Sequence, residues 1–72
     1  MERDFSKLIG RIVEKFGTRV AFCEALGKAP EWLSRRLNNQ TQFDADDMSA
    51  IIDLLEIDPT EIHLYFFAPK VR

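Results

Sequence analysis

The chain has 72 residues, enough for one small domain with a modest hydrophobic core. Its 46% hydrophobic and 31% charged residues exclude a disordered segment, and its apolar runs are too short for a membrane span. The amino-terminus lacks the apolar region of a secretion signal, and the single cysteine excludes an internal disulfide. We therefore expect one cytoplasmic domain over residues 1–72.

The net charge of −2 is unevenly distributed along the chain. Residues 1–42 carry a small excess of cations, whereas residues 43–72 contain seven acids against Lys70 and Arg72. A basic first part would let one face of the molecule meet an anionic partner, while the acidic second part keeps the protein soluble.

Two amphipathic helices are predicted in the first part. Between residues 5 and 16, apolar residues recur at the spacing of one helix face. A second, shorter helix is expected over about residues 19–26. Local signals mark the ends of both helices, namely Asp4 and Gly17 for the first, and Thr18 and Gly27 for the second.

Three further helices have equally local start signals, and no strand of useful length is predicted outside residues 65–71. The third begins at Pro30, which suits the first helical position, and it ends in the polar residues 38–40. The fourth follows Asp44. The fifth is short, about residues 59–65, and an apolar tail over residues 66–72 follows it. The expected capping pairs are Asp44 with Asp47 and Asp58 with Glu61.

No constellation of residues points to catalysis. The sequence has one histidine and one cysteine, no metal-ligand spacing and no glycine-rich phosphate loop. Cys23 is interpreted as a packing residue and His63 as a solvated side chain, and Asp44, Asp46 and Asp47 form a capped helix start. We therefore expect no enzymatic activity, no metal and no cofactor.

A helix that ends at Gly27 and another that begins at Pro30 predict a helix-turn-helix over about residues 18–39. Cys23 provides the small side chain that is needed where the two helices cross. Leu33 and Leu37 lie four residues apart and would anchor the second helix in the core. The predicted architecture is an all-α, compact bundle of five helices.

In their order and spacing, the segments FSKLIGRIVEKFGT, FCEALG, LNN and EIHLYFFAPKV resemble small phage-encoded members of the Cro/repressor-type helix-turn-helix family. The resemblance implies a lambda-repressor-like DNA-binding domain, in which the second motif helix enters the major groove and the first braces the phosphates. The implied function is sequence-specific binding to a double-stranded operator by a transcriptional regulator of phage or prophage type. The implied DNA contacts are Arg19, Lys28, Pro30, Glu31, Ser34, Arg35, Arg36, Asn38, Asn39 and Gln40, with Arg35 placed to read a base and Arg36 to reach phosphate at best.

Several residues depart from the family pattern and support an alternative. Ala29 offers no side-chain cap, Pro30 cannot donate a backbone hydrogen bond to phosphate, and Glu31 repels phosphate. In the alternative, the same scaffold is a protein-binding module, such as a phage antirepressor or modulator that binds a phage or host regulatory protein. Contacts with that partner, or within a homodimer formed on DNA, are expected at Trp32, Leu64, Tyr65, Phe66 and Phe67. The alternative for the residues of the tail is that they close the core of the chain itself.

Overall fold

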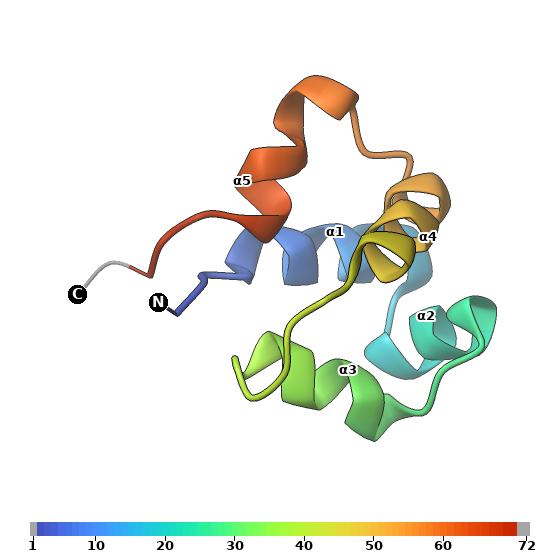
Figure 1. The fold of residues 1–72 in the computed structure, drawn as a ribbon. Coiled ribbons are helices and arrows are strands. Elements are labelled where there is room, and N and C mark those ends of the chain that lie inside the picture. The colour runs from blue at the N-terminus through green and yellow to red at the C-terminus, as the bar shows by residue number, and fades with distance from the viewer. Residues whose placement is uncertain (1, 71–72) are drawn as a thin grey trace.

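A computed structural model describes residues 2–70, which form six helical segments (Figure 1). These are α1 (Ser6–Phe16), α2 (Arg19–Leu26), α3 (Pro30–Leu37), α4 (Ala45–Leu55), the 3₁₀ turn η1 (Pro59–Glu61) and α5 (Ile62–Phe66). Within the described residues the backbone forms no strand, only an isolated bridge between Arg3 and Pro69. The predicted all-α fold is therefore confirmed. Val71 and Arg72 of the predicted tail, and Met1, lie outside the described residues.

Local capping determines where several helices begin. The Thr18 hydroxyl accepts a hydrogen bond of 3.1 Å from the Ala21 N–H at the start of α2. At the start of α4, the Asp44 carboxylate accepts from the Asp47 N–H at 2.7 Å, and the Asp47 carboxylate accepts from the Asp44 N–H at 3.3 Å. This is the predicted capping box. The helix α3 begins at Pro30 without a side-chain cap, as the sequence also predicts.

Two predicted helix starts differ in detail from the structure. The helix α1 begins at Ser6, and the Asp4 carboxylate accepts hydrogen bonds from the Ser6 N–H at 2.8 Å and the Ser6 hydroxyl at 2.6 Å. The Asp58 carboxylate likewise accepts from the N–H and hydroxyl of Thr60, at 2.8 and 2.7 Å, whereas the Glu61 N–H donates to the backbone carbonyl of Asp58 and not to its side chain. In both places a hydroxyl residue two positions after the aspartate competes for its carboxylate. The fifth helix therefore opens with a 3₁₀ turn.

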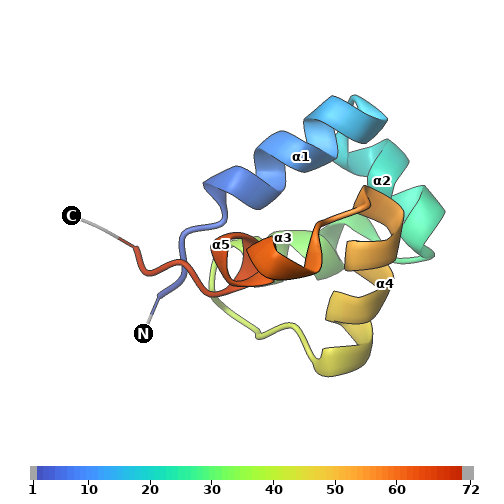
Figure 2. The ribbon, with the colours of Figure 1, turned by 90° about the horizontal axis from the view of Figure 1, so that it is seen from above.

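The helix α1 runs through the middle of the bundle, at a level between α5 and α3 (Figure 1), and it contacts α2, α4 and α5. Seen from above, α5 lies over α3 and α4 stands beside them (Figure 2). No helix in residues 2–70 has the length and apolar character needed to cross a bilayer. The most deeply buried side chains come from four helices and are Leu8, Ile12, Phe22, Cys23, Leu33, Ile51 and Leu55.

The two ends of the described chain lie side by side and are joined by a terminal clasp, formed by residues 2–4, residues 68–70 and Asn39. Two backbone hydrogen bonds, of 2.8 and 3.2 Å, link the two end segments. Asn39 lies just after α3. Its Oδ1 accepts from the Arg3 N–H at 2.7 Å, and its Nδ2 donates to the Arg3 carbonyl at 3.0 Å. One side-chain amide thus satisfies both polar backbone groups of Arg3.

Candidate interaction surface

The helices α2 and α3 and the turn between them, residues 27–29, form the α2–α3 unit on which the predicted functions depend. Gly27 ends α2 with a φ of 78°, in the left-handed region that favours glycine, and its N–H bonds the Cys23 carbonyl at 2.9 Å. Cys23 is only 1% exposed and belongs to the shared core, as its predicted packing role requires. Ala29 is extended and Pro30 begins α3. Local signals therefore set the geometry of this unit.

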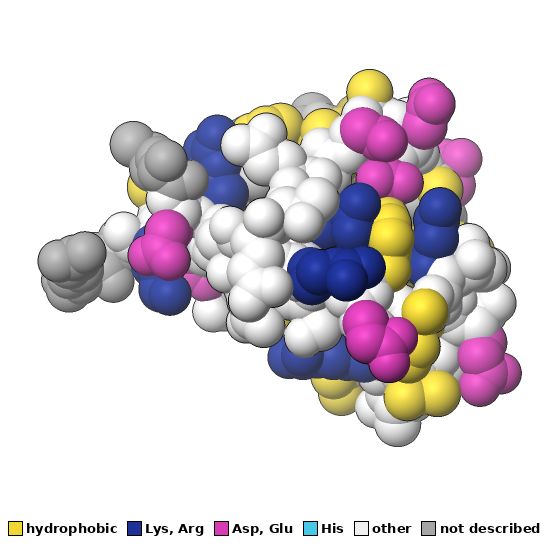
Figure 3. Space-filling model, turned by 60° about the horizontal axis from the view of Figure 1, so that its bottom comes forward, with side chains coloured by type: hydrophobic (Ala, Val, Ile, Leu, Met, Phe, Trp, Pro, Cys, Tyr) yellow, Lys and Arg dark blue, Asp and Glu magenta, His cyan; other side chains and the backbone are white. Residues whose placement is uncertain are grey.

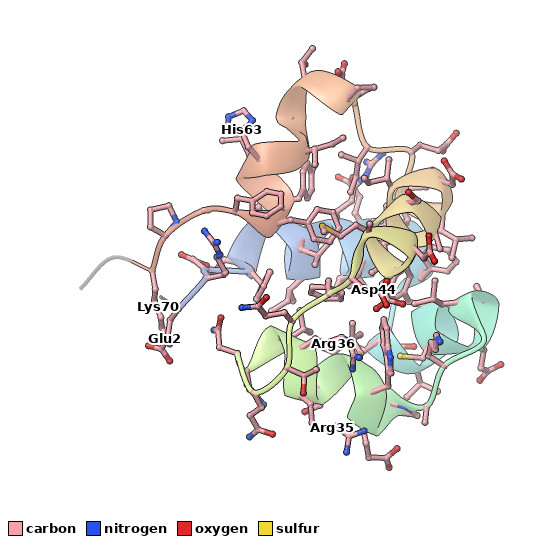
Figure 4. The ribbon with its side chains drawn as sticks, viewed as in Figure 1. Glu2, Arg35, Arg36, Asp44, His63 and Lys70 are labelled. Atoms are coloured by element: carbon pink, nitrogen blue, oxygen red, sulfur yellow. The ribbon has the colours of Figure 1, made fainter. Side chains whose placement is uncertain are left out.

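The exposed face of the α2–α3 unit is mixed in charge. In Figure 3, cationic side chains on this face lie among acidic and apolar ones, and no continuous basic surface forms. Arg35 points away from the body of the molecule (Figure 4). Of the ten residues predicted to contact DNA, eight are exposed, namely Arg19, Lys28, Pro30, Glu31, Ser34, Arg35, Asn38 and Gln40.

Arg36 does not belong to this exposed face. Its side chain points from α3 toward the start of α4 (Figure 4), where its Nε lies 3.8 Å from Asp47 Oδ2, and only 14% and 13% of the two side chains are exposed. Its Nη1 donates to the Trp32 carbonyl at 3.0 Å, and its guanidinium carbon lies 4.1 Å from the centroid of the Trp32 ring. The planar guanidinium stacks on the indole and faces an acid, so it is held inside. The structure therefore corrects the predicted phosphate contact at Arg36, because this side chain braces α3 against α4.

Trp32 is half-buried and is held by its neighbours on several sides. Besides Arg36, the Lys28 Nζ lies 5.3 Å from the ring centroid, and the Phe43 ring meets the indole edge to face at 5.9 Å. The indole therefore contacts both cations, Lys28 and Arg36, through cation–π interactions. The part of the ring that remains exposed lies among charged side chains, and a partner contact at Trp32 stays a prediction.

Asn39 is also withdrawn from the predicted DNA-contacting set. Both ends of its amide bond Arg3 in the terminal clasp, so the side chain is held against residues 2–4 and not directed toward a phosphate. Its backbone has a φ of 64°, a conformation that asparagine tolerates better than most residues. The only local signal for this role is an asparagine just after a helix, because its partner Arg3 lies 36 residues away in the sequence.

The five residues predicted to contact a protein partner have different environments. Tyr65 and Phe66 are buried in the core of the chain itself, at 8% and 3% exposure, which agrees with the alternative that these residues pack within the chain. They face inward because α5 packs against α1. Leu64 and Phe67 are exposed, at 41% and 44%, and Trp32 is half-buried. The apolar surface that remains on α5 is therefore small.

A cavity of about 100 Å³, which the sequence analysis missed, lies between the terminal clasp, the α3–α4 loop (residues 38–44) and the end of α5. Two arginines, Arg3 and Arg36, line it together with aromatic side chains that include Phe43 and Phe67. These residues come from both ends and the middle of the sequence. No local motif therefore predicts the cavity.

The titratable groups give no sign of a reactive centre. Burial, and to a smaller degree the charge of Glu31, raise the pKa of the Cys23 thiol, which keeps it protonated and unreactive at neutral pH. Within residues 2–70, no group of histidines, cysteines and acids is placed to hold a metal ion.

The helix order and the α2–α3 unit define a small all-α domain in which two short helices joined by a tight turn present the exposed face. The chain belongs to the family described as "Protein of unknown function (DUF739)", which matches residues 1–69. It is similar to the modulator of repression (MOR) of the temperate bacteriophage TP901-1 from Lactococcus lactis, known from a solution structure. The identity is 36%, the TM-score is 0.82, and the match covers 100% of this chain and 97% of that one. No curated protein matches the chain.

These comparisons support part of the predicted resemblance. The similarity to a phage regulatory protein agrees with the phage-associated part of the prediction and with the fold. The family that matches is DUF739, whose description assigns no function. The match therefore does not support the finer assignment to the Cro/repressor-type family.

Proposed function

We propose that this protein is a phage regulatory module that acts by binding a repressor protein, the alternative that the sequence analysis left open. The main support is the similarity to a modulator of repression over nearly the full length of both chains, at 36% identity. In this proposal the protein works without enzymatic activity, in the cytoplasm, by occupying a surface of the repressor.

The geometry of the α2–α3 unit favours a protein partner over a DNA operator. The Arg36 side chain packs on Trp32 and points toward Asp47, and the Asn39 amide bonds Arg3, so two of the expected phosphate contacts are directed into the molecule and not toward solvent. The first turn of α3 presents Pro30, which has no N–H to donate to a phosphate, and the Glu31 side chain, which is negatively charged. A mixed face with a half-buried tryptophan is closer in composition to protein interfaces.

The proposed contact is centred on the exposed side of α3. Trp32 would supply the apolar part, while Arg35 and Glu31 on its solvent side would supply charges of both signs. Charges of both signs favour a partner surface that is itself polar and mixed, and they set specificity and association rate more than affinity. The buried Cys23 and the turn at Gly27 would hold this face rigid.

The experiment compares two partners for the purified chain: a random DNA duplex at low salt, and the repressor encoded by the same phage or prophage. We expect no mobility shift with the duplex and a defined complex with the repressor in calorimetry. Glu31→Lys, which leaves the core untouched, should weaken the repressor complex, whereas the matched surface change Glu24→Lys on α2 should not. A chain that shifts the duplex and ignores the repressor would overturn the proposal.

DNA binding remains the second candidate because Arg19, Lys28 and Arg35 are exposed. If the chain binds a duplex, Arg35→Ala should cost about 1–3 kcal/mol and relax the preference at one base pair. The logarithm of affinity should then fall steeply with the logarithm of salt concentration, which measures how many phosphates are contacted. A homodimer on the operator belongs to this candidate.

A further inference from the structure

We propose that the cavity beside the terminal clasp binds one acidic side chain, glutamate or aspartate, of a partner protein. This inference rests on the proposed function, since it names the chemistry of one contact that the partner makes. The cavity has a volume of about 100 Å³. Because a water occupies roughly 30 Å³ of liquid, that space holds about three waters or one short side chain.

The charge of the lining favours an acid. Arg3 and Arg36 both line the cavity, and no aspartate or glutamate is among the described residues that do so. Arg3 forms no ion pair with a residue in the described range, and its guanidinium donates to the Phe67 carbonyl at 3.2 Å. The cavity is thus a positive site in a chain whose net charge is −2.

Arg36 contains one donor that the protein itself leaves unused. Its Nε is buried and has no hydrogen-bond partner among the described residues, although an unpaired buried N–H is costly. Asp47 lies 3.8 Å away, close enough to lower the charge but too far to accept a hydrogen bond. A carboxylate matches the planar fork of a guanidinium, and in the cavity it would give Arg36 a second charge partner.

The walls of the cavity favour a side chain over a nucleic-acid phosphate. Phe5, Phe43, Phe66 and Phe67 line it, with Met48, and these residues provide apolar contacts for the methylene groups that carry a carboxylate. Asn39, Thr41 and Gln42 complete the lining with polar groups. A phosphodiester is bulkier and bears charged oxygens without an apolar stem, so it fits this enclosure poorly. A single buried anchor surrounded by weaker contacts is the usual arrangement at protein interfaces.

The test is a nuclear magnetic resonance titration of the isotope-labelled full chain with N-acetyl-glutamate methylamide. We expect saturable shifts at the Nε–H of Arg36 and at the backbone amides of residues 39–43. The neutral glutamine analogue should bind about tenfold more weakly, because it offers no charge-assisted hydrogen bond. Equal shifts with both probes, or no saturable shift at the solubility limit, would overturn the inference.

Variants and a second probe locate the binding. Arg3→Gln keeps the backbone bonds of the clasp and should weaken glutamate binding about tenfold, whereas the exposed Arg35→Gln should leave it unchanged. Arg36→Lys retains the charge without the fork and should also weaken it. Dimethyl phosphate should bind more weakly than the glutamate probe, and the reverse order would count against a protein side chain as the occupant.

The outcome is separable from that of the proposed function. A chain that binds the repressor but takes no glutamate probe into the cavity refutes this inference alone. A chain that takes the probe but binds no repressor refutes the proposed function alone. If both hold, Arg3→Gln should weaken the repressor complex as well.

Discussion

At the scale of single residues, neighbouring side chains on a helix point about 100° apart, so Arg35 and Arg36 face different surroundings. Arg35 reaches solvent, whereas Arg36 stacks on Trp32 and faces Asp47. Two adjacent arginines thus have different roles: Arg35 is a surface residue, and Arg36 connects α3 to α4. Arg36 and Asp47 form a mostly buried ion pair. Removal of one partner leaves the other as a buried charge without a partner.

Arg36→Ala should therefore lower the free energy of unfolding by about 1–3 kcal/mol, through the lost hydrogen bond to Trp32, the lost stacking and the isolation of Asp47. Urea denaturation measures this change. Arg35→Ala is the matched control and should stay within about 0.5 kcal/mol of the unchanged protein, as exposed positions usually do. Equal stabilities for the two variants would show that Arg36 is no brace.

Asn39 combines two demands that few residues meet together. Its φ of 64° disfavours side chains other than glycine, asparagine and aspartate, and its amide bonds both backbone groups of Arg3. Asn39→Gly should keep the backbone conformation but release the clasp, so the Arg3 N–H should exchange with solvent faster. Asn39→Ala should add the strain of the left-handed conformation, about 1 kcal/mol more. Unchanged exchange at Arg3 in the glycine variant would contradict this role.

At the scale of helices and turns, hydrogen bonds to aspartate link stability to pH. The N–H and hydroxyl of Thr60 donate to Asp58 and lower its pKa below the ordinary 3.8. A carboxyl with a lowered pKa in the folded state stabilises the fold at pH values above its ordinary pKa. That contribution is lost as the pH falls through the folded value.

Asp58→Asn should therefore reduce the loss of stability that occurs on acidification below about pH 4, because one titrating group of the folded state is removed. Urea midpoints at neutral and acid pH give the measurement. Asp46→Asn serves as the control, since the Asp46 side chain is exposed and makes no hydrogen bond within the described residues. A stability that falls more steeply on acidification in the Asp58 variant than in the unchanged protein would contradict the lowered pKa of Asp58.

The sequence predicts those parts of the fold that depend on contacts between residues close together in the chain. The caps at Thr18 and Asp44 and the turn at Gly27 depend on residues at most four positions apart, so their signals survive in the sequence. The inward turn of Arg36 depends on Asp47 in another helix, and the role of Asn39 depends on Arg3 at the far end of the chain. The spacing of apolar residues along the sequence does not predict contacts between residues so far apart in the chain. The cavity and the withdrawn DNA contacts therefore emerge only from tertiary structure.

At the scale of the whole molecule, the proposed repressor contact and a homodimer contact lie at different ends of the bundle. In Figure 1 the helix α5 lies at the opposite side of the molecule from α3. Tyr65 and Phe66 are buried in the core, so self-association through this end of the bundle can use only the exposed Leu64 on α5 and Phe67 directly after it. A stable interface buries about 1,200–2,000 Å² in total, and two apolar side chains supply only a small part of that area. Any homodimer formed this way should be weak.

We expect the isolated chain of 8.4 kDa to show a mass in sedimentation equilibrium that rises with concentration toward that of a dimer. Leu64→Asp should abolish this rise, because it places a charge on the apolar side of α5 that would be buried against the second copy. Val20→Asp is the matched control, since Val20 is also exposed, at 53%, but lies on α2. Loss of the dimer in the Val20 variant alone would move the interface to the α2–α3 unit. A monomer at every concentration would instead leave α5 without a role in assembly, and the repressor would remain the protein partner to seek.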